Sequence, residues 1–262
     1  MESINLSSSQ IIFFLLVFFR VGAIMFSAPF FGAKNLPIQI RILLSFTIAV
    51  VITSAIIPYK NIQIHSLNST QDIVWLFMAV IRETTLGLAI GFIAQLTFIG
   101  IQMTGQIIGN DMGYGMMNLL DPSTHDVITV TSELYTIIAT LIFIVTYSHH
   151  FVLMAIAKSF ETIPLAGWGL SGSFIDHLNT VFSSIFATGL KLAIPILGAL
   201  FLTKISMAIV TRTMPQMNFF VVGFPIQITV GLLAIAITLP FMARVIHGFF
   251  LSMRDNIWFL FR

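Results

Sequence analysis

Long apolar segments alternate with short polar connections along the whole chain. The apolar runs cover about residues 10–32, 40–57, 73–101, 127–157, 178–210 and 219–240. Several reach the roughly 20 residues that a helix needs to cross the hydrocarbon core of a bilayer. Turn-forming residues separate them, as in Asn35–Pro37 and Pro58–Asn61. The pattern predicts an all-α protein with about six hydrophobic helical segments.

The composition supports this prediction and excludes several classes of protein. Of the 262 residues, 57% are hydrophobic and 8% are charged, whereas a soluble domain carries roughly a quarter charged residues. The absence of cysteine excludes disulfides and thiolate metal sites. A net charge of +2 without a basic stripe does not indicate a nucleic-acid partner. The first ten residues lack the basic region of a signal peptide, so we expect the first apolar run to stay in the mature protein.

Three features do not fit a simple membrane-spanning bundle. Lysines and arginines of the short connections divide almost evenly between the two sides, so they do not select an orientation. The run that begins at Val127 is interrupted at Thr146–His150, and the apolar piece beyond it is too short to span, which predicts a hairpin with a short arm. Charged side chains lie within or at the margins of apolar runs, namely Arg20, Arg82, Glu83, Glu133, Lys191 and Lys204.

These six charged residues need partners, because an unpaired charge facing lipid is costly. Arg82 and Glu83 project about 100° apart on a helix, so they cannot face the same way. Either the charges pair inside one chain, or they contact neighbouring subunits of an assembly. Both interpretations predict that Arg82→Ala or Glu83→Ala is harmful, but only the second predicts loss of a complex with an intact monomer.

Glycine and proline positions predict close packing and helix breaks. Gly87 and Gly91 lie four residues apart, as do Gly105 and Gly109, and such spacing lets another backbone approach one face of a helix. We interpret it as tight packing rather than as a specific dimer. Pro195 and Pro225 fall inside apolar runs, where each removes a backbone donor. The interrupted helices either line a cavity or are simply curved.

The longest connection of the first half has an unusual composition. GNDMGYGMMNLLDPSTHD, residues 109–126, contains three glycines and three methionines but no lysine or arginine. Glycine permits positive φ, and methionine supplies flexible apolar bulk. The segment is therefore either a turn whose methionines pack on neighbouring helices, or a mobile apolar loop that fills a narrow lumen and withdraws from it.

No motif indicates catalysis or a cofactor. His149 and His150 are adjacent and their side chains diverge, and His125 has only Asp121 and Asp126 nearby, so neither group completes a metal site. The chain contains no phosphate-binding loop, no HExxH and no credible Ser/His/Asp grouping. We therefore expect no enzyme activity and no cofactor.

Four stretches of the chain resemble the FliR family, a subunit of the flagellar type III export gate. They are Pro215–Leu232 with its VVGFP sequence, Tyr147–Leu165 with the paired histidines, the loop Asn110–Asp126, and Arg20 followed by Ala28–Gly32. The resemblance runs in order along essentially the whole chain. The VVGFP and DPSTHD sequences are more similar to the flagellar branch than to the homologous subunits of virulence injectisomes.

The resemblance implies a subunit of a helical ring in the bacterial inner membrane, within the flagellar basal body. Several copies each of FliP and FliQ would complete the ring, with FlhB near its entrance, and unfolded rod, hook and filament proteins would leave the cytoplasm through it. The chain would consist of a FliP-like portion, residues 1–177 with a plug loop at about 106–121, and a FliQ-like hairpin, residues 178–262. The plug itself carries over to Gly109, Asn110, Asp111, Met112, Gly113, Tyr114, Gly115, Met116, Met117 and Asn118.

On this hypothesis the chain helps to form and close an export pore. Met112, Met116 and Met117 would act as a deformable seal, the loop glycines as a hinge, and the charged residues as assembly contacts. Energy for transport would come from elsewhere, since the chain has no nucleotide site.

Two other hypotheses stay open at this point. A self-contained secondary transporter would frame a midplane site with helices broken at Pro195 and Pro225, and Glu133 or Lys191 would carry protons. A purely structural nucleator would let other subunits assemble without contributing a gate.

Overall fold

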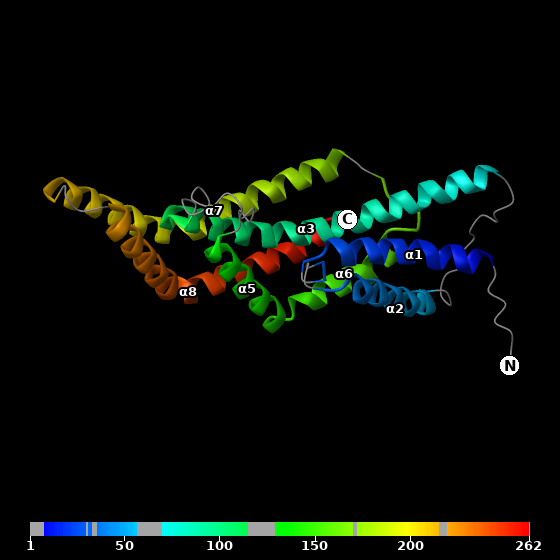
Figure 1. Cartoon of the computed structure of the whole chain (residues 1–262). Helices are drawn as coiled ribbons and strands as arrows, with labels where there is room; N and C mark the ends of the chain where they lie inside the picture. The colour runs from blue at the N-terminus through cyan, green and yellow to red at the C-terminus, as the bar shows by residue number, and fades with distance from the viewer. Residues whose placement is uncertain are drawn as a thin grey trace. The chain divides into compact units, whose positions relative to one another are not determined.

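The structure is a computed structural model that describes residues 8–29, 31–32, 36–56, 70–114, 129–169, 172–214 and 219–261. These residues form α-helices and no strand, so the prediction of an all-α protein is confirmed. The helices, shown in Figure 1, are α1 (Ser8–Ser27), α2 (Ile38–Ile56), α3 (Thr70–Met112), α5 (Val130–Val145), α6 (Ser148–Thr162), α7 (Gly172–Thr213) and α8 (Phe219–Phe259).

The described helices match the six predicted apolar runs. Five of them are long and apolar enough to cross a membrane, and the pair α5 and α6 makes a sixth if it counts as one span. The prediction of about six hydrophobic segments is therefore confirmed in number and in order.

Three helices are much longer than a membrane span requires. α3, α7 and α8 contain 43, 42 and 41 residues, and their candidate membrane-spanning segments cover 40, 42 and 39 residues, each with an 18-residue apolar window. At about 1.5 Å per residue each segment is about 60 Å long, twice the hydrocarbon thickness of about 30 Å. Only a tilt of about 60° would keep such a helix within the hydrocarbon, whereas membrane helices tilt by about 0–40°. About half the length of each helix therefore needs a different environment from the bilayer core.

The connection between α5 and α6 corrects the predicted short-armed hairpin. α5 has 16 residues and α6 has 15, and the two helices meet at a bend of 67°. Tyr147 takes a φ of 56°, which redirects the chain, while the Thr146 hydroxyl donates to the carbonyl oxygen of Ile142 at 2.7 Å. The second arm is long because the helix continues through the polar residues that follow its apolar piece.

The predicted helix breaks at Pro195 and Pro225 are also corrected. Both prolines lie inside continuous helices, Pro195 in α7 and Pro225 in α8, and Pro240 lies within α8 as well. A single proline removes one backbone hydrogen bond and bends a helix, but the long helical segments on both sides keep their own hydrogen bonds. Figure 1 shows α8 changing direction part-way along its length. Curvature, rather than interruption, describes these helices.

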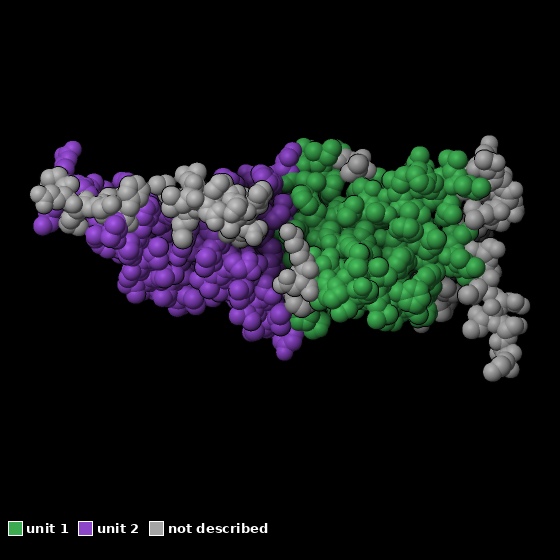
Figure 2. Space-filling model, viewed as in Figure 1, with its two compact units in different colours: residues 1–95, 149–178, 253–262 green, residues 96–148, 179–252 purple. Residues whose placement is uncertain are grey.

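The chain divides into two compact units, coloured in Figure 2. Unit 1 comprises residues 1–95, 149–178 and 253–262, and unit 2 comprises residues 96–148 and 179–252. In unit 1, α1 packs against α2, and Ile12, Leu16 and Ala79 form part of the core. In unit 2, the rings of Phe98, Phe143 and Phe250 meet at centroid distances of 5.2 to 5.5 Å and join α3, α5 and α8. The predicted division into residues 1–177 and 178–262 rests on the family resemblance rather than on contacts within the chain, and it stays a prediction.

Candidate functional site

The predicted plug loop begins on a helix. Residues Gly109–Met112 form the last turn of α3, and Gly115–Asn118 lie outside the described residues. α3 ends where Gly113 takes a φ of 99°, a left-handed conformation that terminates many helices and suits glycine because it has no Cβ. The Gly113 N–H donates to the carbonyl oxygen of Asn110 at 3.1 Å, which closes the final turn.

An ion pair joins this end of α3 to α7 within unit 2. The Nζ of Lys204 donates to a carboxylate oxygen of Asp111. The two side chains are 40% and 29% exposed, and ion pairs at such exposure contribute only about 0–1 kcal/mol to stability. A carboxylate is unfavourable near the negative end of a helix dipole. The lysine therefore serves mainly to neutralise Asp111 and to set the position of the helix end.

Met112 joins the same helix end to α8. Its side chain is completely buried, and a methyl group at Gly231 would stand only 2.7 to 2.8 Å from the side-chain atoms of Met112. Gly113 faces the ring of Phe224 with a similarly small gap. Met112 was predicted to belong to a deformable seal, but in this structure it is a packed core residue.

The threonine-rich start of α5 packs on the glycines that precede this site. A methyl group at Gly105 would stand 2.6 Å from the Cα of Ser132, and one at Gly109 would overlap the hydroxyl of Thr131. The Thr131 hydroxyl donates to the carbonyl oxygen of Gly105 at 2.9 Å, and Thr129 caps the N-terminus of α5. α3 and α5 are thus in contact through their backbones, and the end of α3 touches α5, α7 and α8.

The remaining glycine pair of α3 packs on α1 in unit 1. A methyl group at Gly87 would stand 2.5 Å from the carbonyl oxygen of Arg20. At Gly91 it would overlap the hydroxyl of Ser27, which itself donates to the carbonyl oxygen of Ala23 at 2.6 Å. Both glycines are therefore positions where two helix backbones meet.

A buried ion pair connects α1 to α3 in unit 1. Arg20 and Glu83 are 0% and 1% exposed. The Nε of Arg20 donates to Oε2 of Glu83 at 2.5 Å, and its Nη2 donates to Oε1 at 3.0 Å, a bidentate geometry that gives the strongest carboxylate contacts. The guanidinium also lies over the ring of Phe160, 4.3 Å from its centroid.

The same pair holds the end of α6 and the turn that follows it. Nη1 of Arg20 donates to the carbonyl oxygen of Ser159 at 2.8 Å. This contact lies near the C-terminus of α6, where the partial negative charge of the helix dipole favours a cation. Glu83 Oε1 accepts from the N–H of Ala166 at 2.8 Å, and Arg82 donates to the carbonyl oxygen of Ala166 at 2.9 Å. Ala166 has a φ of 57°, unusual for a residue with a Cβ. Three charged side chains therefore fix one strained turn.

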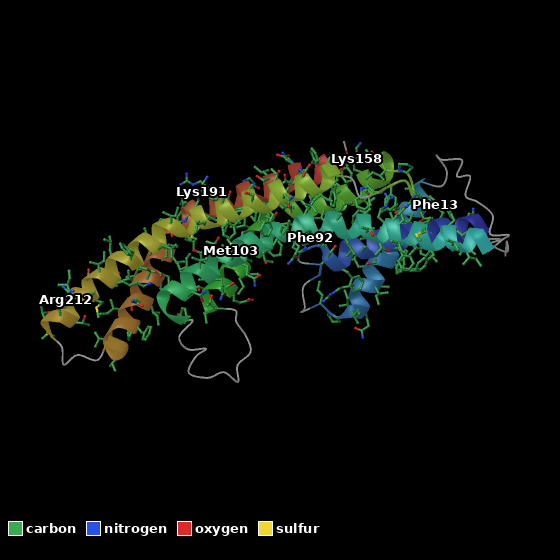
Figure 3. All side chains as sticks on the ribbon, turned by 90° about the horizontal axis from the view of Figure 1, so that it is seen from above. Phe13, Phe92, Met103, Lys158, Lys191 and Arg212 are labelled. Atoms are coloured by element: carbon green, nitrogen blue, oxygen red, sulfur yellow. The ribbon has the colours of Figure 1, made fainter. Side chains whose placement is uncertain are left out.

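The six predicted intersubunit charges fall into two groups. Glu133 lies in the first turn of α5 and is exposed, and Lys191 projects from α7 away from the neighbouring helices (Figure 3). Ion-pair partners inside the chain are present for Arg20, Glu83 and Lys204, whereas exposed side chains are found at Arg82, Glu133 and Lys191.

No metal-binding group occurs among the residues that the structure describes. Unit 2 contains an open cavity of about 630 Å³, and its mainly apolar lining comes from Leu141, Ile142, Val145, Thr146, Ala243, Arg244 and His247. Neither of the two prolines nor Glu133 or Lys191, the residues of the transporter hypothesis, lines this cavity. The cavity thus gives no support to a midplane site framed by broken helices.

Sequence reasoning missed the residues that complete both contact networks. It gave no role to the turn around Ala166, to Ser159 or to Phe160. It also assigned Asp111 to the plug and Lys204 to the intersubunit charges, and did not predict that the two would pair. Phe224 lies in the VVGFP sequence and Gly231 a few residues beyond it. The resemblance of that stretch to a known family was the only signal that pointed to their region.

Together these features define a class, a helical membrane-associated protein whose long apolar helices are tied by buried polar contacts. The family model described as bacterial export proteins, family 1, matches residues 11–253. The chain belongs to this family, and its resemblance to FliR is confirmed.

The chain is similar to curated proteins over most of its length. It is 29% identical to flagellar biosynthetic protein FliR of Escherichia coli (strain K12) over 227 residues, which covers 86% of this chain and 83% of the relative. It is 29% identical to FliR of Bacillus subtilis (strain 168) over 241 residues, 90% of each chain. It is also 30% identical to Yop proteins translocation protein T of Yersinia pestis over 168 residues, 63% of this chain and 64% of the relative. The chain is thus a membrane-associated component of a bacterial type III export apparatus, and none of these names describes a catalysed reaction.

Proposed function

We propose that the chain is a channel-forming subunit of the flagellar type III export gate. It helps to assemble the pore and closes it with the loop that follows α3, while unfolded flagellar proteins are exported through the open state. The observation that carries this proposal is the length of α3, α7 and α8, whose candidate membrane-spanning segments of 39 to 42 residues exceed a bilayer span.

The excess apolar surface needs protein partners. Only 33% of the 18-residue apolar window of α7 and 22% of that of α8 is buried within the chain. Exposed side chains include Phe201 and Leu202 on α7 and Ile237 on α8, the last 79% exposed. Lipid can cover about half the length of such a helix, and water cannot cover the rest favourably. Neighbouring helical subunits are the remaining cover.

The FliR family likeness supports the identity of these neighbours. We propose several copies each of FliP and FliQ as ring partners, with FlhB near the entrance, in the bacterial inner membrane within the flagellar basal body. Residues 1–177 would form the FliP-like portion and residues 178–262 the FliQ-like hairpin. α7 and α8, joined by a short connection, supply the two arms of that hairpin.

Exposed charges provide candidate contacts to these neighbours. Arg82, Glu133 and Lys191 lie on apolar helices with exposed side chains, where facing lipid would be costly. We propose that these three meet opposite charges or polar groups of adjacent subunits. Arg20, Glu83 and Lys204 hold the chain itself together, and Arg82 also donates to the carbonyl oxygen of Ala166 within the chain.

The loop that follows Gly113 is the proposed plug. Met116 and Met117 would supply the deformable apolar seal, because the thioether side chain adapts to irregular gaps. The packed position of Met112 favours an anchoring role for that residue instead.

Flagellar biosynthesis is favoured over virulence secretion. The FliR proteins of Escherichia coli and Bacillus subtilis match 86% and 90% of this chain, whereas the Yop translocation protein matches 63%. The alternative, an injectisome export-gate subunit, would use the same pore architecture.

A deletion tests the seal. Removing residues 115–120 from the chain, expressed with its partner subunits, should make the membrane permeable to ions and small molecules because the apolar plug is lost. The matched control removes residues 61–66, an equally long part of the connection between α2 and α3, and should leave the membrane tight. Ion conductance of the reconstituted complex measures both.

Other outcomes identify the competing hypotheses. A secondary transporter would lose uptake of its solute without becoming leaky. A structural nucleator would lose the complex altogether. An assembled complex that stays tight after the 115–120 deletion would contradict the proposed seal.

A further inference from the structure

We propose that the open cavity of unit 2 binds one anionic phospholipid, with its phosphate at Arg244 and His247 and part of an acyl chain along α5. This inference adds a ligand to the chain and is independent of the proposed channel and its plug. It requires only the membrane association of the chain, together with the charges and the packing of the cavity itself.

The two sides of the cavity, which come from α5 and α8, differ in chemistry. Leu141 and Val145 of α5 are 58% and 74% exposed, and residues four apart lie on one face of a helix. Arg244 and His247 of α8 are exposed as well, and their spacing of three residues also places them on one face. An apolar rim and a cationic rim therefore border the same cavity.

Packed contacts beside the cavity fix the positions of α5 and α8. The Tyr135 hydroxyl of α5 donates to the sulfur of Met242 on α8 at 3.2 Å, and the ring centroids of Phe143 and Phe250 are 5.2 Å apart. All four side chains are buried. The cavity is thus formed by the fold itself, and its volume of about 630 Å³ falls within the range of about 300–1,000 Å³ that is usual for ligand pockets.

The described part of unit 2 offers Arg244 no carboxylate partner. Its acidic residues there are Asp111, which already pairs with a lysine, and Glu133. Glu133 precedes Leu141, the first lining residue of α5, by about 12 Å along the helix. No hydrogen bond or ion pair joins Arg244 or His247 to another residue that the structure describes. Because arginine is always charged, it needs an anion from outside the chain.

A phospholipid matches both rims at once. Arginine binds phosphate oxygens in a bidentate geometry, and basic pockets between membrane helices bind anionic headgroups. A flexible acyl chain can follow the apolar side, whereas free phosphate would leave the exposed side chains of Leu141 and Val145 uncovered. Five helices are long and apolar enough to cross a membrane, so bilayer lipids surround the chain. A carboxylate of a neighbouring subunit is the competing occupant.

Native mass spectrometry of the full chain in mild detergent, titrated with phosphatidylglycerol or phosphatidylcholine, tests the site. We expect saturable binding of one phosphatidylglycerol and weaker binding of phosphatidylcholine, whose choline cation offsets its phosphate. Arg244→Gln should lower the affinity for phosphatidylglycerol about tenfold, because charge-assisted hydrogen bonds are lost. The matched control is Arg212→Gln, which removes an exposed arginine of α7 in the same unit but outside the cavity, and should leave the affinity unchanged.

Two further measurements test the place of the acyl chain. Ala243 is half-buried and lines the cavity, so Ala243→Phe should fill this space and lower the affinity although Arg244 is kept. An unchanged helical circular dichroism signal checks that this variant folds. Phosphatidylglycerol with a photoreactive group on its acyl chain should label a peptide that contains residues 141–146.

Several results would overturn the proposal. Equal affinities for the two lipids, or equal losses in Arg244→Gln and Arg212→Gln, would show general attraction rather than a site. Complete displacement of phosphatidylglycerol by glycerol phosphate, or labelling confined to other peptides, would show that the acyl chain is not bound here. Phosphatidylglycerol that binds the chain alone but is absent from the complex isolated with FliP and FliQ would identify a neighbouring subunit as the occupant.

Discussion

The arginine in the middle of α1 is the most demanding single side chain to bury. Arg20 is fully buried, and its hydrogen bonds go to Glu83, the Ser159 carbonyl and the end of α6. Burying two charges is favourable only when their geometry is good and their remaining hydrogen-bonding groups are satisfied. Both conditions hold here, since Glu83 also accepts from the N–H of Ala166. The pair therefore acts as the polar centre of unit 1.

Removing one partner of this pair should be strongly destabilising. Glu83→Leu leaves the Arg20 charge buried and unpaired, which should cost about 3–5 kcal/mol of stability. Arg20→Met combined with Glu83→Leu should cost clearly less than the sum of the single changes, because neither charge is then stranded. Thermal loss of the helical circular dichroism signal in detergent measures this.

The exposed pair Lys158–Glu161 serves as the control, with side chains that are 42% and 64% exposed. Lys158→Ala should change stability by at most about 1 kcal/mol. Equal effects of Glu83→Leu and Lys158→Ala would contradict the buried-pair account.

At the scale of elements, α3 organises both units through its glycines. Gly87 brings it against the backbone of α1 in unit 1, and Gly105 brings it against α5 in unit 2. Close backbone approach of this kind favours helix association where the surroundings are as apolar as the helices. The hydroxyls of α5 add hydrogen bonds to the carbonyls of α3, as from Ser132 to Gln102 at 3.0 Å.

Glycine-to-alanine substitutions should separate packing from helix propensity. Gly87→Ala should destabilise the protein by about 1–3 kcal/mol, because the added methyl meets backbone and forces α1 away. Gly22→Ala on α1, where nothing lies within 4 Å of the new methyl, should be neutral or stabilise by up to about 1 kcal/mol. Thermal unfolding of the two variants side by side gives the comparison, and the reverse order would contradict the packing.

Element type could be predicted from the sequence, but element length and contacts could not. Runs of apolar residues are enough to predict helices, because hydrocarbon and buried environments require satisfied backbone groups. The continuation of α3 to Met112 was not evident, because Gln102, Gln106 and several glycines end its apolar run. Those residues stay helical because α5 and α7 pack on them, which is a tertiary effect. Pro195 and Pro225 had the opposite effect: they suggested interrupted helices, but both lie inside continuous helices whose long flanking segments tolerate them.

The partners of the charged side chains were even harder to predict from the sequence than the lengths of the helices. The sequence indicated that Arg20 and Glu83 needed partners, but the two residues are 63 positions apart and nothing between them indicates that they meet. Asp111 and Lys204 are 93 residues apart. Such contacts depend on how helices are placed side by side, and no local pattern encodes that placement.

As a whole, the chain is suited neither to water nor to a lipid bilayer alone. The chain is too apolar for water, and three of its helices are about twice as long as the roughly 30 Å hydrocarbon core. The interior charges are satisfied inside the chain for Arg20 and Glu83, while large apolar side chains on α2, α7 and α8 stay exposed. A subunit of a larger helical assembly satisfies these conditions, in agreement with its export-protein family.

Site-specific photo-cross-linking in the assembled apparatus tests this account most directly. A photoreactive phenylalanine analogue would be placed at position 114, directly after Gly113, or at position 237, the highly exposed site on α8. With an export substrate stalled in transit by a folded fusion domain, position 114 should cross-link to the substrate and position 237 to a neighbouring subunit. Products with lipid alone at both positions would contradict the conclusion that this chain lines an export channel and is covered by other protein.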